Sequence, residues 1–175
     1  MFDLKQTYLT HLRALSALAL MIALIAATST AFVPPVKAAG TLSPNSSLTP
    51  EQIEAAVEEY FDAVSAHDVQ RYVNTFAPDG VLEDPVGTPP LQGTAAITGF
   101  ITNIIAPFSD IKHRIQDVVV CGNEAAVNWK LDLKTTTNKH ITIDGMGIFR
   151  FNEQGKLESV REFWDLAAFL ADLQG

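Results

Sequence analysis

The chain has 175 residues and a formal net charge of −8, with 12 Lys and Arg against 20 Asp and Glu. This length suits one domain with a single core. Because the basic residues form no stripe, the acidic balance argues against nucleic acid and anionic membrane surfaces as partners. Cys121 is the only cysteine, which excludes an intrachain disulfide.

The first 38 residues have the pattern of a secretory signal peptide. A start that contains Lys5 and Arg13 precedes an apolar run over residues 14–27, and Val36-Lys37-Ala38 offers small residues where signal peptidase cleaves. We therefore expect a signal peptide over 1–38 and export to the periplasm or the medium. The alternative is an uncleaved membrane anchor, although polar residues and prolines interrupt the run before the roughly 20 residues that a span needs.

Residues 39–49 are rich in Ser, Thr, Pro and Gly and carry no charge, which predicts a linker. Residues 50–175 are then the expected folded domain. Only three basic residues and Asp3 precede residue 39, so 9 of the 12 basic and 19 of the 20 acidic residues follow it. The expected domain is therefore clearly acidic.

Three helices are predicted in the first half of this domain. Thr49-Pro50-Glu51-Gln52 has the N-cap, the proline and the glutamine of a helix start, and Tyr60 lies on the apolar stripe that follows. Asp68 is predicted to cap a second helix over Val69–Phe76, and Thr94 to cap a third.

The second half changes to a period of two, which is typical of strands. The predicted strands are Ile111–Val120, Ala125–Lys134, Lys139–Phe151 and Leu157–Trp164. Helices followed by a meander predict an α+β domain, with three N-terminal helices packed on a curved, mostly antiparallel sheet. Gly145 and Gly147 inside the third strand indicate a bend, a bulge or the close approach of a bulky group.

An acidic pair in the stretch Val81–Gly93 is the first candidate for chemistry. Pro85 favours extended backbone at Asp84, which therefore ends a strand. Alternation along the strand places Asp84 and Glu83 on opposite faces, so they do not converge as the carboxylates of a glycosidase must. By themselves these patterns are also compatible with two solvated turn carboxylates and with Tyr60 as a plain core residue.

Five stretches carry a family resemblance: Tyr60–Asp68, Phe76–Gly80, Glu83–Gly87, Phe149–Asn152 and Glu162–Trp164. Together they resemble the bacterial ketosteroid isomerases and the wider SnoaL-like, or nuclear transport factor 2-like, superfamily. The match over Glu83–Gly87 is the most specific for the isomerase-like branch. The resemblance runs from about Glu51 to Asp165 and implies a cone-shaped α+β fold, a homodimer and no cofactor.

The resemblance also assigns roles to single residues. Asp84 falls on the family's general base and Tyr60 on its oxyanion-hole tyrosine, at the family's interval of 84 − 60 = 24 positions. The family's second oxyanion donor, an aspartic acid kept protonated by an apolar site, falls on Gly147, so that donor is absent. The expected substrate-binding residues are Trp164, Gly147, Phe100, Phe149 and Met146.

These assignments imply allylic isomerisation of an apolar ketone. Asp84 would carry a proton between two carbons while Tyr60 holds the dienolate oxygen. With one donor missing, the chain is a weakened isomerase or uses another donor such as the Trp164 indole. The alternative is a non-catalytic carrier of a small hydrophobic, steroid- or polyketide-like molecule, whose cavity Gly147 enlarges and makes less polar.

A further interpretation keeps catalysis and changes the substrate, as in the related dehydratases, polyketide cyclases and epoxide hydrolases. The sequence offers no clear counterpart of their acid, histidine or arginine constellations. His113 alternates with apolar neighbours and could face a cavity, or it could lie at a surface. His113 and His140 are too isolated in the sequence to predict a metal site.

Overall fold

The computed structural model describes residues 48–174. The helices in this part are α2 (Pro50–Ser65), α3 (Val69–Thr75), α4 (Gly93–Ile105) and α5 (Leu166–Gln174). The strands are β1 (Phe76–Glu83), β2 (Leu91–Gln92), β3 (Phe108–Cys121), β4 (Glu124–Thr135), β5 (His140–Phe151) and β6 (Leu157–Phe163). The predicted signal peptide and all but the last two residues of the predicted linker lie outside the described residues. Within residues 48–174, no helix is long and apolar enough to cross a membrane.

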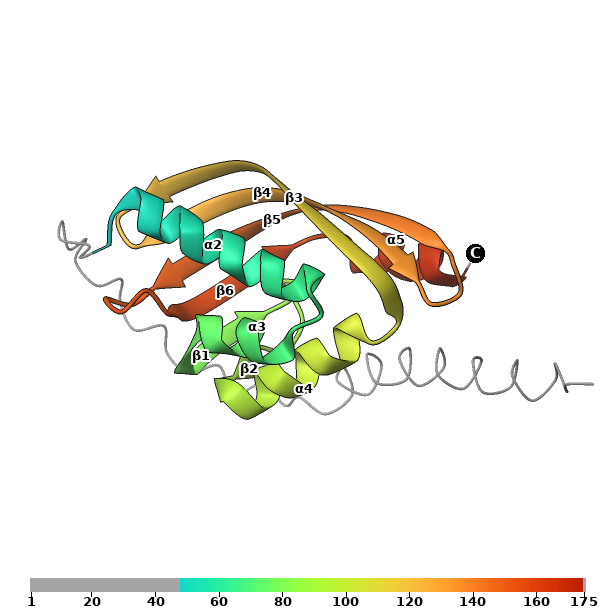
Figure 1. Ribbon diagram of the computed structural model, residues 1–175, viewed down its shortest axis with the longest axis horizontal. Coiled ribbons are helices and arrows are strands. Elements are labelled where there is room, and N and C mark those ends of the chain that lie inside the picture. The colour runs from blue at the N-terminus through green and yellow to red at the C-terminus, as the bar shows by residue number, and fades with distance from the viewer. Residues whose placement is uncertain (1–47, 175) are drawn as a thin grey trace, which may run out of the picture. The chain divides into compact units, whose positions relative to one another are not determined.

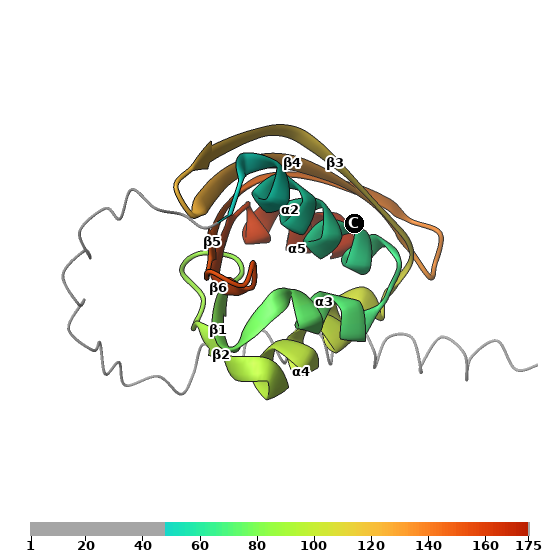
Figure 2. The ribbon, with the colours of Figure 1, turned by 60° about the vertical axis from the view of Figure 1, so that its left-hand side comes forward.

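The strands form one curved sheet in the order β2-β1-β6-β5-β4-β3. Neighbouring strands are antiparallel except β1 and β6, which are parallel. The sheet is seen along its length in Figure 1, and Figure 2 shows β3, β4 and β5 curving over α2, with α3 and α4 beyond that helix. The predicted α+β fold, with helices against one face of a curved, mostly antiparallel sheet, is confirmed.

Helix starts follow the predicted caps in two cases out of three. The Thr49 side chain accepts from the backbone N–H of Gln52 at 3.3 Å, and the Gln52 side chain accepts from the backbone N–H of Thr49 at 2.8 Å. Asp68 accepts from the N–H of Arg71 at 3.0 Å. The prediction that Thr94 caps the third helix is wrong. Gln92, still extended at the end of β2, holds the N-cap position, so Thr94 already lies inside the first turn.

Aromatic packing fixes α2 against the middle of the sheet. The Tyr60 ring meets the Phe149 ring of β5 edge to face, with centroids 5.1 Å apart, and Phe61 packs against both. All three side chains are buried. Burying a side chain of this size stabilises the fold by about 1.5–3 kcal/mol, so these contacts hold the helix in a defined position over β5.

The parallel pairing of β1 with β6 determines where the loop after β1 lies. Leu82 and Glu83 are in register with Val160 and Arg161 of β6. Beyond the strand, the backbone N–H of Val86 donates to the carbonyl of Glu162 at 2.7 Å. The loop that carries Asp84 is therefore fixed to the end of β6.

Candidate active site

Asp84 follows β1 directly, and its side chain lies on the inner side of the sheet with the buried Leu82. Glu83 lies on the other side, where its carboxylate accepts from Arg161 Nε at 2.9 Å and from the backbone N–H of Gly87 at 3.0 Å. The two neighbouring acids are thus separated, as strand alternation requires. Only Asp84 is available to the interior.

The Trp164 indole orients the Asp84 carboxylate. Its Nε1–H donates to Asp84 Oδ1 at 2.5 Å. Burial raises the pKa of Asp84 to about 6, while this hydrogen bond stabilises the carboxylate and lowers the pKa. The result is a carboxylate that is mostly ionised at neutral pH and more basic than an exposed one, which suits a group that must take up and return a proton.

Tyr60 brings a neutral hydroxyl to the same interior region. Tyr72 of α3 donates its hydroxyl to the Tyr60 oxygen at 3.1 Å, and the two ring centroids are 4.9 Å apart. Burial raises the pKa of Tyr60 far above its usual value, and the ionisable groups of Tyr72, Glu162 and Asp84 nearby act in the same direction. Burial also raises the pKa of Tyr72 well above its usual value, and the Asp84 charge is the next largest cause. The Asp84 charge thus contributes to the raised pKa values of both tyrosines.

Glu162 of β6 is a buried carboxyl that the sequence patterns did not single out. Its side chain is only 2% exposed. Oε1 accepts from the Tyr60 hydroxyl at 3.3 Å, and Oε2 accepts from Trp129 Nε1 at 2.8 Å. Burial, followed by the charge on Asp84, raises the pKa of Glu162 to about 8, although both hydrogen bonds lower it. A carboxyl in this environment holds its proton at neutral pH.

Gly147 leaves the space that the Glu162 carboxyl occupies. The two residues are cross-strand partners in β5 and β6. A Cβ on residue 147 would lie 2.6 Å from Glu162 Oε2 and 2.5 Å from an edge carbon of Phe149, both far inside contact distance. The family resemblance expects an acid at residue 147. The carboxyl of Glu162, on the neighbouring strand β6, lies in that space instead.

The arrangement of a buried acid and tyrosine on this fold agrees with a family match. The family model of the SnoaL-like domain matches residues 57–160, more than half of the chain. The chain belongs to the SnoaL-like domain family. Its membership confirms the resemblance that the sequence motifs indicated.

This SnoaL-like domain has curated relatives and solved structures of similar fold. It is 26% identical over 113 residues to "Steroid Delta-isomerase" of Nocardioides simplex, covering 65% of this chain and 89% of the relative. It is 26% identical over 132 residues to "Sordarin/hypoxysordarin biosynthesis cluster protein G" of Sordaria araneosa, covering 70% and 87%. The structure of SalBIII, an epoxide hydrolase/cyclase-like enzyme with a role in pyran ring formation in the polyether salinomycin, matches with a TM-score of 0.60. That match has 24% identity and covers 66% of this chain and 92% of the other, and it shows the shared fold.

The remaining residues expected to bind substrate lie in different places. Phe149 faces the interior against Tyr60, and Phe100 of α4 is partly buried against the core. Met146 is 48% exposed and pairs with the exposed Phe163 on the opposite face of the sheet. The expectation for Met146 is wrong, because alternation along β5 turns its side chain away from the face that Gly147 and Phe149 share.

His113 has a structural environment in this SnoaL-like domain. Its Nδ1 is 2.7 Å from the Ser65 hydroxyl oxygen, and its ring meets Phe61 edge to face at 4.7 Å. Burial lowers the pKa of His113, so the neutral imidazole is favoured. These contacts join β3 to the C-terminal end of α2.

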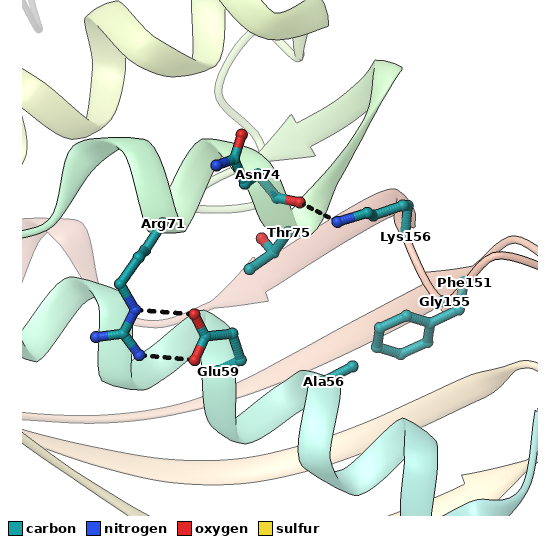
Figure 3. Close-up of a pocket in the computed structure, with 8 residues that line it drawn as sticks. All are labelled: Ala56, Glu59, Arg71, Asn74, Thr75, Phe151, Gly155 and Lys156. Atoms are coloured by element: carbon teal, nitrogen blue, oxygen red, sulfur yellow. Dashed lines mark hydrogen bonds and ion pairs between the residues drawn. The ribbon is translucent and has the colours of Figure 1, made fainter.

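A surface pocket of about 230 Å³ lies elsewhere, between α2, α3 and the turn before β6 (Figure 3). Arg71 and Glu59 form an ion pair at its wall, and Lys156 donates to the carbonyl of Asn74 at 2.6 Å. A second pocket, of about 100 Å³, lies beside α5. Neither pocket is lined by Asp84, Tyr60 or Glu162, so the buried carboxyl and tyrosine group is a separate site.

Proposed function

We propose that this SnoaL-like domain isomerises a small hydrophobic ketone by moving a carbon–carbon double bond into conjugation with the carbonyl. The observation that carries the proposal is the environment that Asp84 and Tyr60 share. Burial gives Asp84 a pKa of about 6 and keeps Tyr60 protonated. Groups with such divergent pKa values in one buried region have the properties of a base and a hydrogen-bond donor. The relative named steroid delta-isomerase supports this reaction class.

The reaction needs two proton transfers and no redox step. The Asp84 carboxylate removes a proton from the carbon between the carbonyl and the double bond, and the electron pair of that C–H bond forms a dienolate. The carbonyl oxygen gains the negative charge and accepts a hydrogen bond from Tyr60. Asp84 then returns the proton to the far carbon of the former double bond, and the carbonyl re-forms. One carboxyl serves both transfers, as a base first and an acid second.

Trp164 has a positioning role in this scheme. Its N–H occupies Oδ1 of Asp84 and leaves Oδ2 for the proton. The indole ring is itself held by Phe169 of α5, edge to face at 5.6 Å between centroids. The carboxylate is thus held in place before substrate binds, which reduces the cost of orienting it in the transition state.

The carrier alternative depends on a cavity that Gly147 enlarges and makes less polar. The space beside Gly147 is instead occupied by the Glu162 carboxyl. Gly147 therefore does not give the larger, less polar cavity that a carrier would use. A base and a neutral hydroxyl donor whose pKa values are shifted apart by burial favour catalysis over simple binding.

The test is conversion of a β,γ-unsaturated 3-ketosteroid to its conjugated isomer, followed by ultraviolet absorbance. Asp84→Asn is expected to lower kcat/KM by roughly a hundredfold to ten-thousandfold, the usual contribution of a positioned general base. The matched control is Asp79→Asn, at an exposed acid on β1, the strand that precedes Asp84, and it is expected to behave like the wild type. A wild-type rate equal to that of Asp84→Asn would remove the proposal.

We also propose that the domain acts after export and as a homodimer. The leader pattern supports export, with cleavage near Ala38. The outer face of the sheet exposes Val119, Met146 and Phe163, and exposed apolar groups of this size support a self-association surface.

A further inference from the structure

The hydroxyl of Tyr60 and the carboxyl of Glu162 lie side by side in the buried site. Tyr60 OH is 3.3 Å from Glu162 Oε1, and both side chains are nearly inaccessible to water, at 4% and 2% exposed. From this geometry we infer that Glu162 is a second hydrogen-bond donor to the substrate oxygen, acting as a neutral carboxylic acid together with Tyr60. The inference rests on the proposed isomerisation and adds a catalytic residue to it.

Trp129 determines which oxygen of Glu162 carries the proton. Oε2 accepts from Trp129 Nε1 at 2.8 Å and Oε1 accepts from the Tyr60 hydroxyl, but an indole N–H can only donate, whereas a tyrosine hydroxyl can also accept a hydrogen bond. The proton of the neutral acid is then on Oε1, the oxygen next to Tyr60. The hydroxyl that could donate to a substrate is therefore on the side where the phenol already lies.

Burial and the Asp84 charge keep Glu162 neutral, although the hydrogen bonds from Trp129 and Tyr60 lower its pKa. From α2 and α3 it faces Tyr60 and Tyr72, whose burial keeps their pKa values above the normal range, and from the loop after β1 it faces the Asp84 carboxylate. Since Asp84 ionises first, its negative charge disfavours a second one nearby. Burial acts in the same direction and is the larger cause. At neutral pH the site therefore combines one carboxylate with one carboxylic acid.

Two donors at this separation can converge on one oxygen. Hydroxyl-to-oxygen hydrogen bonds are about 2.7 Å long, so an acceptor can form one to each of two donor oxygens that are 3.3 Å apart. A ketone oxygen placed there would gain negative charge when Asp84 removes the neighbouring proton. Both hydrogen bonds strengthen as that charge develops, which is the requirement for lowering the barrier.

Tyr72 completes a chain of hydroxyls behind this pair. Its hydroxyl donates to the Tyr60 oxygen at 3.1 Å, which leaves the Tyr60 proton free to point toward Glu162 or a ligand. Each donation makes the next hydroxyl a better donor. Hydrogen bonds therefore run from Tyr72 to Tyr60 and from Tyr60 to the substrate oxygen, and Glu162 of β6 donates to the same oxygen from the sheet.

The first experiment measures the pH dependence of kcat/KM in the wild type, Glu162→Gln and Glu162→Leu. Glutamine is a neutral donor that does not titrate, and Trp129 favours the rotamer that turns its NH₂ toward Tyr60. The wild-type rate should fall above about pH 8, where Glu162 loses its proton. That fall should be absent in Glu162→Gln. Glu162→Leu should lose roughly a hundredfold in kcat/KM, as when one oxyanion donor is removed.

Glu158→Gln is the matched control, because Glu158 is exposed on the same strand. It should keep the wild-type pH profile. An alkaline fall that persists unchanged in a folded Glu162→Gln protein would overturn the inference. Thermal unfolding of each variant shows whether the fold is intact, and the near-isosteric Gln variant keeps the test valid if Leu does not fold.

A second experiment separates this inference from the proposed reaction. Binding of 2-naphthol, whose oxygen resembles that of a dienolate, is measured by its fluorescence in an Asp84→Asn background. Binding should weaken at least about tenfold with Glu162→Leu and much less with Glu162→Gln, since one charge-assisted hydrogen bond contributes this much or more. Equal binding by all three proteins would overturn the inference, even if isomerisation is observed. If 2-naphthol binds with the expected order of affinities but the wild type does not isomerise the steroid, Glu162 is supported as a donor and the proposed isomerase activity is refuted.

Discussion

Removing the indole donor of Trp164 should change the pH at which the enzyme becomes active. In Trp164→Phe the Asp84 carboxylate loses the hydrogen bond to Oδ1, which is 2.5 Å long in the wild type. That bond favours the ionised form, so its loss raises the pKa of Asp84 above about 6. Activity requires the ionised form, so the acid limb of the pH profile of kcat/KM must shift to higher pH.

The size of the shift follows from the strength of the bond. A hydrogen bond to a charged group contributes about 1.5–3 kcal/mol, and one pKa unit corresponds to about 1.36 kcal/mol. Asp84 and Trp164 both keep some solvent exposure, which places the effect at the lower end, near one unit. Below pH 5 the variant should therefore be roughly tenfold slower than the wild type, with a smaller difference near pH 8.

The assay follows conversion of the β,γ-unsaturated 3-ketosteroid by ultraviolet absorbance. The pH dependence of kcat/KM is measured for the wild type, Trp164→Phe and Trp129→Phe. Trp129 is the matched control, because its indole donates to Glu162 instead of Asp84. Trp129→Phe should leave the acid limb nearly unchanged and move the alkaline limb upward. An acid limb at the same pH in Trp164→Phe and wild type would refute the assignment of that limb to Asp84.

Three further predictions concern stability, assembly and processing. Gly147→Ala should lower the free energy of unfolding in urea by about 1–3 kcal/mol, since the added Cβ would overlap the Glu162 carboxyl; an unchanged value would show that the carboxyl moves freely. The pKa of Glu162 is about 8 in the fold and 4.5 ordinarily, so the folded state holds a proton that the unfolded state releases. The contribution of Glu162 to stability should then be fully present below about pH 4.5 and lost by about pH 8, so the unfolding free energy of the wild type should fall relative to that of Glu162→Gln over this range; a difference that does not change with pH would contradict a neutral Glu162. Light scattering should give the mass of a dimer and mass spectrometry a chain cleaved near Ala38, whereas a monomer or an intact leader would contradict these expectations.

Local patterns predicted most of the elements but not how distant ones pair. The caps at Thr49 and Asp68 and the period-two runs depend on neighbours within a few residues, and they mark α2, α3 and the long strands correctly. The parallel pairing of β1 with β6 joins residues almost eighty positions apart and has no local signal. Neither β2 nor α5 was predicted, and the wrong cap at Thr94 came from expecting a side-chain cap where backbone geometry alone starts the helix.

Site residues that lie in a sequence motif could be predicted. The residue that enters the site only through the pairing of two strands could not. Asp84 and Tyr60 were assigned from the resemblance, and the Asp84 charge contributes to the raised pKa of Tyr60. Glu162 was missed because the family's second acid maps onto Gly147 of β5, whereas its cross-strand partner on β6 carries the carboxyl. Strand alternation could have indicated that Glu162 faces the interior, because side chains two residues apart lie on the same face and Glu162 is two residues from the buried Val160 and from Trp164. The same alternation excludes Met146.

The most direct test of Asp84 and Tyr60 as one site is a crystal structure of Asp84→Asn with a phenolic steroid bound. We expect the phenolic oxygen to lie within about 3 Å of the Tyr60 hydroxyl, the length of a hydrogen bond, with the substituted side chain at position 84 against the adjacent ring. A steroid bound in the pocket beside Arg71 and Lys156, or one whose oxygen points into solvent, would contradict the shared site.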